Sequence, residues 1–162
     1  MNKFIGLYLS LGSNQGDRRY YILEAVRMLD EGLGMPHSAL SRLLEFPSWG
    51  FAGADFLNCA VRYDIPAAGQ DLRLHARSVL ALAKEIENSL GRRQEVVFDS
   101  VGKRIYRDRP IDIDILFYGM LRLDEPDLTI PHKLISERDF VKIPLRDVSL
   151  PDIQSAFPEI FA

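Results

Sequence analysis

Cysteine is almost absent from this sequence, since Cys59 is the only one among 162 residues. A single cysteine excludes an internal disulfide and fits a protein that folds in a reducing compartment. Its apolar neighbours favour a buried, unreactive side chain over a catalytic nucleophile.

Long hydrophobic runs and an excess of positive charge are also missing. No apolar stretch approaches the ~18–20 residues of a membrane span. The first apolar segment, Phe4 to Leu11, is too short for a secretory signal. The formal net charge of −3 gives no general attraction to nucleic acid, so any basic site must be local. We therefore expect a cytoplasmic protein, and the length is that of one domain, residues 1–162.

Hydrophobic periodicity predicts alternating strands and helices. In chain order we expect a strand at 4–11, a helix from 17 to about 33, strands at 38–46 and 55–63, a helix at 70–90, a strand that holds Asp112 and Asp114, a hairpin from it to 121–123, and short helices near 133–141 and 151–157. This order predicts an α+β, ferredoxin-like sandwich, in which helices pack on the faces of an antiparallel sheet. Because that fold hosts many functions, it does not decide the activity.

The strongest chemical signal is the pair Asp112 and Asp114, which alternates with Ile111, Ile113 and Ile115. Alternate strand residues project from one face, roughly 6–7 Å apart, so one face is apolar and the other carries two carboxylates. Mg²⁺ prefers one or two carboxylates plus phosphate oxygens and waters, and two ions ~3.5–4 Å apart can clamp a phosphate in transfer. The alternative is a solvated strand face paired with nearby arginines.

Basic residues accumulate in the aperiodic segment that precedes this pair. They are Arg92, Arg93, Lys103, Arg104, Arg107 and Arg109. Arginine binds phosphate oxygens bidentately, and phosphoryl transfer combines such groups with metal ions. On the segment alone, a solvated basic loop remains equally good.

A second cluster lies between Glu45 and Asn58, where Pro47, Trp49 and Phe56 accompany two glycines. Aromatic faces and one amide suit a flat heterocycle, although each aromatic alone is better explained by core packing. The Asn58 amide lies among apolar residues in mid-strand and needs a partner, which a ligand could supply.

The three histidines and Glu87 carry less weight when taken alone. His37 and His75 lack metal-ligand spacing to His132, so we reject a zinc site. His132 is by default structural, and Glu87, near the end of the long helix, is by default a surface charge.

Five segments in order now make the sequence similar to a known family. They are Leu11 to Asp17, Phe56 to Val61, Glu87 with Gly91-Arg92, Arg109 to Leu116, and Ile130 to His132 with Glu137 to Val141. Together they resemble the 6-hydroxymethyl-7,8-dihydropterin pyrophosphokinases of folate synthesis, from Tyr8 to about Pro151. The resemblance implies a ferredoxin-like fold and transfer of the pyrophosphoryl group of ATP to the pterin hydroxymethyl group, leaving AMP.

The resemblance also implies a role for each matched residue. Asp112 and Asp114 would hold two Mg²⁺ ions, and Arg92 and Arg109 would be catalytic arginines. The pterin site would comprise Pro47, Ser48, Trp49, Phe56, Asn58 and Phe140. The ATP site would comprise Glu87, Arg92, Arg109, Ile115, Thr129, His132 and Arg138. The expected ligands are thus ATP, Mg²⁺ and 6-hydroxymethyl-7,8-dihydropterin, bound by a monomer that contacts neither nucleic acid nor membrane.

Four positions depart from the usual pattern of the family. Phe46 stands where a small polar residue is usual, Gln94 replaces a common arginine, Tyr106 replaces a tryptophan, and Asp127 lies where a basic residue can occur. They place one pterin hydrogen bond and some nucleotide contacts in doubt.

Two rival functions remain open. Some domains of this fold bind RNA on sheet aromatics, but the acidic total and the carboxylate pair oppose a phosphate backbone. A metal-dependent phosphate hydrolase would use the same carboxylates, and would release AMP without a pterin.

Overall fold

The computed structural model describes residues 3–48, 53–91, 97–98, 100–102, 104–105 and 110–161. Its strands are β1 Phe4–Ser13, β2 Ala39–Leu40, β3 Leu44–Phe46, β4 Phe56–Pro66, β5 Val97–Phe98, β6 Arg104–Ile105, β7 Asp112–Tyr118, β8 Leu123–Glu125 and β9 Leu128–Ile130. Its helices are α1 Arg18–Leu33, α2 Leu72–Ser89, the 3₁₀ turn η1 Ile135–Glu137, α3 Asp139–Val148, α4 Pro151–Ala156 and α5 Pro158–Phe161.

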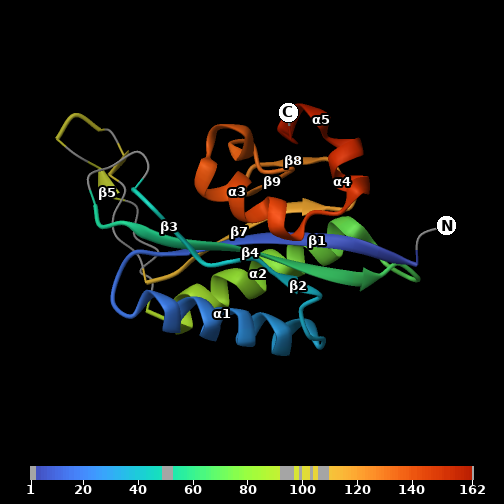
Figure 1. The fold of residues 1–162 in the computed structure, drawn as a ribbon, viewed down its shortest axis with the longest axis horizontal. Helices are drawn as coiled ribbons and strands as arrows, with labels where there is room; N and C mark the ends of the chain where they lie inside the picture. The colour runs from blue at the N-terminus through green and yellow to red at the C-terminus, as the bar shows by residue number, and fades with distance from the viewer. Residues whose placement is uncertain are drawn as a thin grey trace.

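The main sheet is antiparallel and confirms the predicted fold class. Its strand order is β2-β4-β1-β7, with β3 also paired to β4 (Figure 1). The chain makes strand, helix, two strands, helix and strand again, which is the ferredoxin-like arrangement. In this topology β1 and β3 end, and β4 and β7 begin, at the same end of the sheet.

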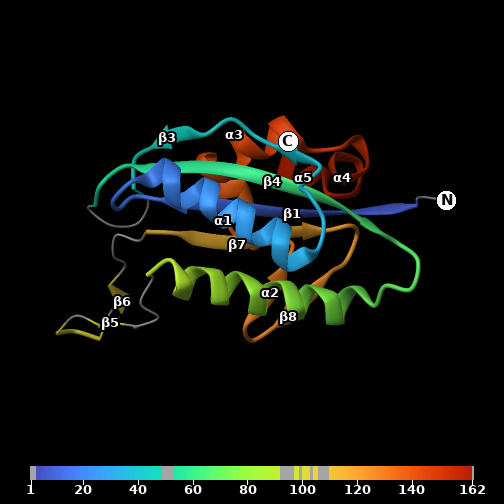
Figure 2. The same ribbon diagram turned by 90° about the horizontal axis from the view of Figure 1, so that it is seen from below.

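Helices cover both faces of the sheet and enclose two apolar cores. The views of Figures 1 and 2 show α1 and α2 on one face and α3, α4 and α5 on the other. The first core joins Leu9, Val61 and Ile115 to buried residues of α1 and α2. The second joins Tyr8 and Phe117 to α3 and the C-terminal helices. β1, β4 and β7 alternate between these cores, because successive strand residues point to opposite faces.

The two long helices follow the predicted periodicity. Asp17 caps α1 by accepting the N–H of Tyr20, and Gly34 ends it with a left-handed φ of 71° that a side chain would strain. Asp71 caps α2 in the same way, accepting the N–H of Leu74. The expected bounds of both helices are therefore confirmed to within a few residues.

The predicted strand over 38–46 is in fact two short strands, β2 and β3. Between them the Ser41 hydroxyl accepts the backbone N–H of Ala60 at 2.8 Å, a position that a strand carbonyl would otherwise take. The same hydroxyl donates to the Arg42 carbonyl at 2.9 Å. A local side-chain hydrogen bond thus interrupts the ladder, as serine can do.

The predicted hairpin from the Asp112 strand to 121–123 is wrong. β8 pairs with β9 in a separate two-stranded sheet. After the turn at Gly119 the chain leaves the main sheet, and the free edge of β7 is met later, where the His132 N–H donates to the Leu116 carbonyl at 3.1 Å. Such a return brings the segment after β9 beside the aspartate strand.

The helix expected near 133–141 is shifted toward the C-terminus. A 3₁₀ turn, η1, precedes α3, which runs from Asp139 through Pro144 to Val148. Val141, Leu145 and Val148 recur at helical spacing and are buried against the sheet, so the apolar stripe continues past the proline.

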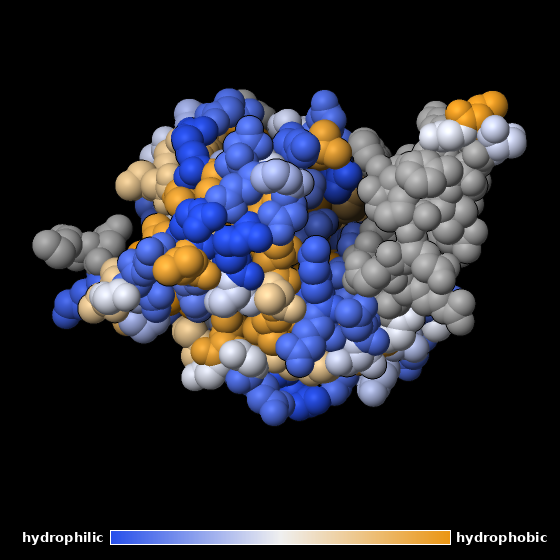
Figure 3. Space-filling view, turned by 180° about the vertical axis from the view of Figure 1, so that it is seen from behind, coloured by the Kyte–Doolittle hydropathy of each residue, from blue (hydrophilic) through white to orange (hydrophobic). Residues whose placement is uncertain are grey.

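The surface gives no sign of a membrane-spanning helix. Within the described ranges, no helix combines the length and the apolar character that crossing a bilayer requires. On the face shown in Figure 3, hydrophilic residues cover most of the area and hydrophobic residues appear in small groups between them.

Candidate active site

The two aspartates of β7 lie on the opposite face from their isoleucine neighbours, as predicted. Asp112 and Asp114 are half-buried, whereas Ile113 and Ile115 are 6% and 4% exposed in the core beneath the sheet. The carboxylates therefore share the face that α3 partly covers.

A row of three residues crosses the sheet at this end. Gly12 of β1 is the register partner of Asn58 on β4 and of Asp112 on β7. In the next row on this face, Ser10 lies between Ala60 and Asp114. Since adjacent strands are about 4.8 Å apart, the backbones at Asn58 and Asp112 are separated by roughly 10 Å. An amide and a carboxylate thus face the same space across a glycine.

Gly12 makes that space possible, and the sequence analysis included it only in the family-like segment Leu11 to Asp17. A Cβ atom at Gly12 would lie 2.6 Å from Nδ2 of Asn58 and 3.3 Å from Cδ1 of Phe56. The first distance is shorter than folded proteins tolerate, so any side chain here would displace the amide. The signal was invisible in the sequence because it depends on the register of β1 against β4.

The Asn58 side chain has an unmet hydrogen-bonding capacity. The residue is 3% exposed, and its Oδ1 atom is buried without a hydrogen-bond partner. Buried polar atoms are nearly always paired, and leaving one unpaired costs about 1–3 kcal/mol. An N–H donor on a bound ligand would remove this cost, in agreement with the role expected for Asn58.

Hydrogen bonds hold both arms of the loop between β3 and β4. Ser48 Oγ accepts the Gly53 N–H at 3.1 Å, and Asn14 Nδ2 donates to the Ala54 carbonyl at 3.0 Å. Arg18 donates to the Asp55 carbonyl at 3.0 Å. The loop enters and leaves next to Phe56, which is half-buried on the Asn58 face of β4.

Aromatic residues approach this face from two elements. Phe56 comes from β4, and Phe140 comes from α3, where the Arg138 guanidinium lies 5.5 Å from its ring centroid. Phe46, one of the departures from the family pattern, is the register partner of Phe56 on β3. The aromatic character expected for the pterin site is thus present on the described residues.

Glu87 contradicts its default assignment as a surface charge. Its residue exposure is 4%, and its Oε2 atom accepts the Ile113 N–H at 2.9 Å. The last turn of α2 packs against the edge of β7, so this carboxylate meets the strand between the two aspartates. A signal was available, because Glu87 lies four residues after Ala83 on the apolar face of the helix.

His132, Thr129 and Arg138 lie along the segment that returns to β7. Burial is the main cause that lowers the pKa of His132; the charges of Arg138 and Lys133 act in the same direction, and Asp112 opposes them. The His132 ring is therefore within electrostatic reach of both Arg138 and Asp112 of β7. Its Nδ1 atom accepts the Leu134 N–H at 3.3 Å, which assigns the proton of the neutral ring to Nε2.

Two expected nucleotide residues differ in how they are presented. Thr129 is half-buried between the core residues Leu128 and Ile130. Ile115 points into the core, so only its main chain is available to a nucleotide.

Asp127, one of the departures from the family pattern, forms a bidentate ion pair with Arg77, at 2.8 and 3.0 Å.

Some expected residues lie outside the part of the chain that the structure describes. These are the proposed catalytic Arg92 and Arg109, Trp49 of the pterin site, and the departures Gln94 and Tyr106.

The donor chemistry of β7 fits magnesium. Asp112 and Asp114 supply hard oxygen ligands from one strand face, and Mg²⁺ commonly takes one or two carboxylates while keeping waters and phosphate oxygens. Among the described residues, no group of three or more His, Cys, Asp or Glu side chains is placed to hold a metal alone. A site of this kind is completed by its substrate.

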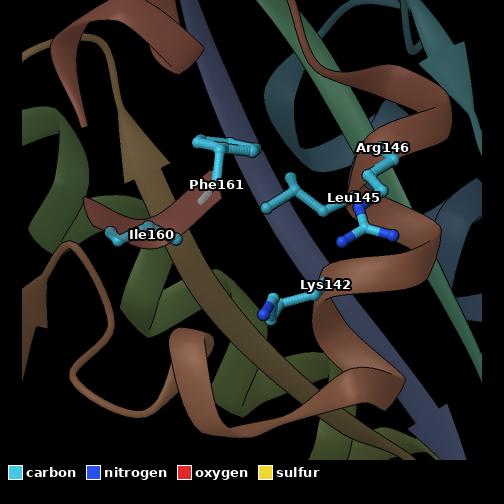
Figure 4. Close-up of a pocket in the computed structure, with 5 residues that line it drawn as sticks. All are labelled: Lys142, Leu145, Arg146, Ile160 and Phe161. Carbon is cyan, nitrogen blue, oxygen red and sulfur yellow. The ribbon is translucent and has the colours of Figure 1, made fainter. Parts of the chain in front are cut away.

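A hollow between α3 and α5 is separate from these groups. Figure 4 shows Lys142, Leu145 and Arg146 of α3 facing Ile160 and Phe161 of α5. None of these residues belongs to the predicted substrate sites.

Comparisons with known proteins extend over the whole site. The family model described as 7,8-dihydro-6-hydroxymethylpterin-pyrophosphokinase matches residues 8–150. The 2-amino-4-hydroxy-6-hydroxymethyldihydropteridine pyrophosphokinase of Porphyromonas gingivalis is 40% identical over 145 residues, 88% of this chain and 90% of that protein. Its namesake in Methylorubrum extorquens is 35% identical over 147 residues, 90% and 83% of the two chains. The mitochondrial folate synthesis bifunctional protein of Pisum sativum is 36% identical over 141 residues, 86% of this chain and 24% of that protein.

Proposed function

This chain belongs to the 7,8-dihydro-6-hydroxymethylpterin-pyrophosphokinase family, and we propose that the residues gathered around Gly12 carry its reaction. The enzyme transfers the pyrophosphoryl group of ATP to 6-hydroxymethyl-7,8-dihydropterin in folate synthesis, giving the pterin diphosphate and AMP. One observation carries the assignment of residues. Asn58 and Asp112 lie on either side of Gly12 in one row of the sheet, so an amide suited to a heterocycle and a carboxylate suited to a metal ion share the same space.

The pterin lies over Gly12, between the aromatic rings of Phe56 and Phe140. Its polar edge donates to the unpaired Oδ1 atom of Asn58, and the loop at Pro47 and Ser48 closes the outer side. Trp49, which is outside the described residues, is assigned to the same site from the family resemblance. Support comes from the buried unpaired oxygen and from the absence of a side chain at Gly12. Stacking gives affinity, and the amide gives orientation.

ATP lies beside β7, with its phosphates directed at Asp112 and Asp114. These two carboxylates would hold two Mg²⁺ ions, which would supply positive charge to neutralise the phosphates. Thr129, His132 and Arg138 contact the nucleotide from the returning segment. Ile115 contributes its main chain, and Glu87 fixes the strand edge.

The chemical step is an in-line displacement at the β-phosphorus of ATP. The pterin hydroxymethyl oxygen forms a bond to the β-phosphorus. The bond between this phosphorus and the α,β-bridging oxygen breaks, and AMP leaves with that oxygen. The hydroxyl proton passes to solvent, and this mechanism uses no side chain as a general base. Arg92 and Arg109 stabilise the charge that spreads over the phosphate oxygens, so catalysis depends on positioning and electrostatics.

The proposed enzyme is a monomer built as one domain over residues 1–162. Sedimentation of the active enzyme at assay concentration tests that state directly. A dimeric species carrying the activity would contradict it.

The function is tested by AMP formation from ATP with and without the pterin. The transferase produces AMP only when 6-hydroxymethyl-7,8-dihydropterin is present, in a 1:1 ratio to pterin diphosphate. Chelation of divalent cations abolishes the reaction, and added Mg²⁺ restores it. AMP release at the same rate without pterin would identify a hydrolase instead.

A further inference from the structure

Two arginines on one face of α2 hold the tip of the β8–β9 hairpin. Arg77 donates to Glu125 at 2.6 Å and to both carboxylate oxygens of Asp127, at 2.8 and 3.0 Å. Arg73, one helical turn earlier, donates to Glu125 at 2.7 Å. Figure 2 shows β8 next to α2, away from the main sheet.

Apolar packing and a backbone hydrogen bond attach the hairpin to the rest of the protein. Leu123 of β8 packs against the core in which Leu128 and Ile130 of β9 are buried, and the His132 N–H donates to β7. Near the tip, Arg73 and Arg77 form ion pairs with Glu125 and Asp127. These ion pairs therefore set how the tip is oriented and how its charge is balanced.

The charge balance matters because the acids flank a strand to which we assign nucleotide binding. Asp127 precedes Thr129 by two residues, which at most span about 7 Å of extended chain. ATP bound beside Thr129 brings several negative charges close to Asp127. Without a counter-charge, the Asp127 carboxylate would repel it at this range.

We propose that Arg77 is a positioning residue for ATP. Arg77 neutralises Asp127 and Glu125, and it holds β9 so that Thr129 faces the nucleotide. This inference rests on the proposed function, since it takes the nucleotide site to include Thr129. It also accounts for the acidic residue at position 127: its side chain is engaged by α2 instead of facing the phosphates.

The test compares Arg77→Ala with a matched control. Arg27 of α1 also forms ion pairs with two acids, Glu24 and Glu31, on a helix that carries no site residue, although its side chain is more exposed than that of Arg77 (58% against 35%). Arg77→Ala should raise KM for ATP roughly 3- to 10-fold, the range expected for loss of one ion-pair network. KM for the pterin and kcat should change less than twofold, and Arg27→Ala should change nothing.

Rescue separates charge neutralisation from general loosening of the fold. In Arg77→Ala/Asp127→Asn one repelling charge is removed, so KM for ATP should fall back at least halfway on a logarithmic scale. Hydrogen exchange of residues 123–130 should be faster in Arg77→Ala, and exchange of β1 and β4 should be unchanged. Unchanged KM for ATP in Arg77→Ala, or equal increases in both KM values, would overturn the proposal.

Failure of the proposed function would look different. The affinity of each variant for a non-hydrolysable ATP analogue with Mg²⁺, measured by calorimetry, needs no turnover. If the wild-type protein binds the analogue but makes no pterin diphosphate, the function is wrong, and the affinities still decide the role of Arg77.

Discussion

The Oε2 atom of Glu87 accepts the backbone N–H of Ile113, 2.9 Å away, so a buried carboxylate on α2 is attached to the strand between Asp112 and Asp114. Among the described residues β7 is an edge strand, so this N–H is not paired with another strand there. The Glu87 carboxylate supplies the acceptor that a neighbouring strand would otherwise provide. The position of Asp112 and Asp114 depends on this hydrogen bond.

Glu87→Ala is expected to destabilise the protein by about 1–3 kcal/mol, because the buried Ile113 N–H loses its acceptor. Glu87→Gln retains an acceptor oxygen and should cost less. Urea unfolding of both variants measures the difference. Glu85→Ala, at an exposed position two residues earlier on the same helix, is the control and should stay within ~0.5 kcal/mol of wild type. Equal losses for Glu85→Ala and Glu87→Ala would contradict the bond.

Asp112→Asn and Asp114→Asn should each lower the rate of AMP formation by at least ~100-fold. Removing a residue that only supports a metal ligand already costs about 10–100-fold, and a direct ligand should cost more. Both side chains are half-buried on a solvent-facing strand face, so the urea midpoint should hardly move. Rates are measured across a Mg²⁺ titration with Glu85→Gln as a charge-loss control. Near-normal turnover in either aspartate variant would exclude it as a ligand.

Regular elements were predictable because each buries one side. In β7 the alternation of Ile and Asp assigns each residue to a face, and in α2 the spacing of Ala76, Val79 and Ala83 assigns the buried stripe. These patterns depend only on helix and strand geometry, which are local properties. The strand order followed from the sequence of elements.

The features that were missed depend on which distant residues become neighbours. Ser41 breaks a strand because it meets Ala60, Gly12 is needed because it meets Asn58, and Glu87 is buried because α2 ends at β7. The encounters of Ser41 and Gly12 leave no periodic trace in the chain, whereas Glu87 does fall on the apolar face of α2. The hairpin was misassigned for the same reason, since β8 pairs with β9 and not with β7.

Asn58→Leu should separate stability from binding. Leucine has the same branching, although it is larger, and removes an acceptor that has no partner in the free protein, so the free energy of unfolding should stay within ~1 kcal/mol of wild type or rise. Pterin affinity should fall about 10- to 100-fold, since each tenfold corresponds to about 1.4 kcal/mol. Calorimetry measures both ligands on the same variant, and ATP-analogue affinity is the internal control. Unaltered pterin affinity would remove Asn58 from the site.

Gly12→Ala should weaken pterin binding at least ~10-fold by displacing the Asn58 amide, from which its Cβ would lie only 2.6 Å. Overpacking of this kind also destabilises, typically by about 1–3 kcal/mol. Truncating the clashing partner tests the cause: Gly12→Ala/Asn58→Ala should recover stability that Gly12→Ala loses, without recovering pterin affinity. Strictly additive losses of stability in the double variant would show that the two residues do not clash.

His132 should make the protein sensitive to mild acid. Burial lowers the pKa of His132 in the folded state, reinforced by Arg138 and Lys133 and opposed by Asp112, while the unfolded chain keeps the ordinary value of about 6.5. Between these two values the unfolded state binds one more proton than the folded state. The free energy of unfolding therefore has its full His132 contribution above the unfolded pKa and loses it as the pH falls toward the lowered folded pKa.

The variant His132→Asn tests this effect, because its side-chain oxygen can still accept the Leu134 N–H but does not titrate. The free energy of unfolding of this variant should decrease less than that of wild type when the pH is lowered from 7.5 to 5.5. Burial lowers the pKa of His75 in the same direction, but His75 is present in both proteins, and the difference between them isolates His132. Identical pH profiles for wild type and His132→Asn would show that the ring is not held neutral beside β7.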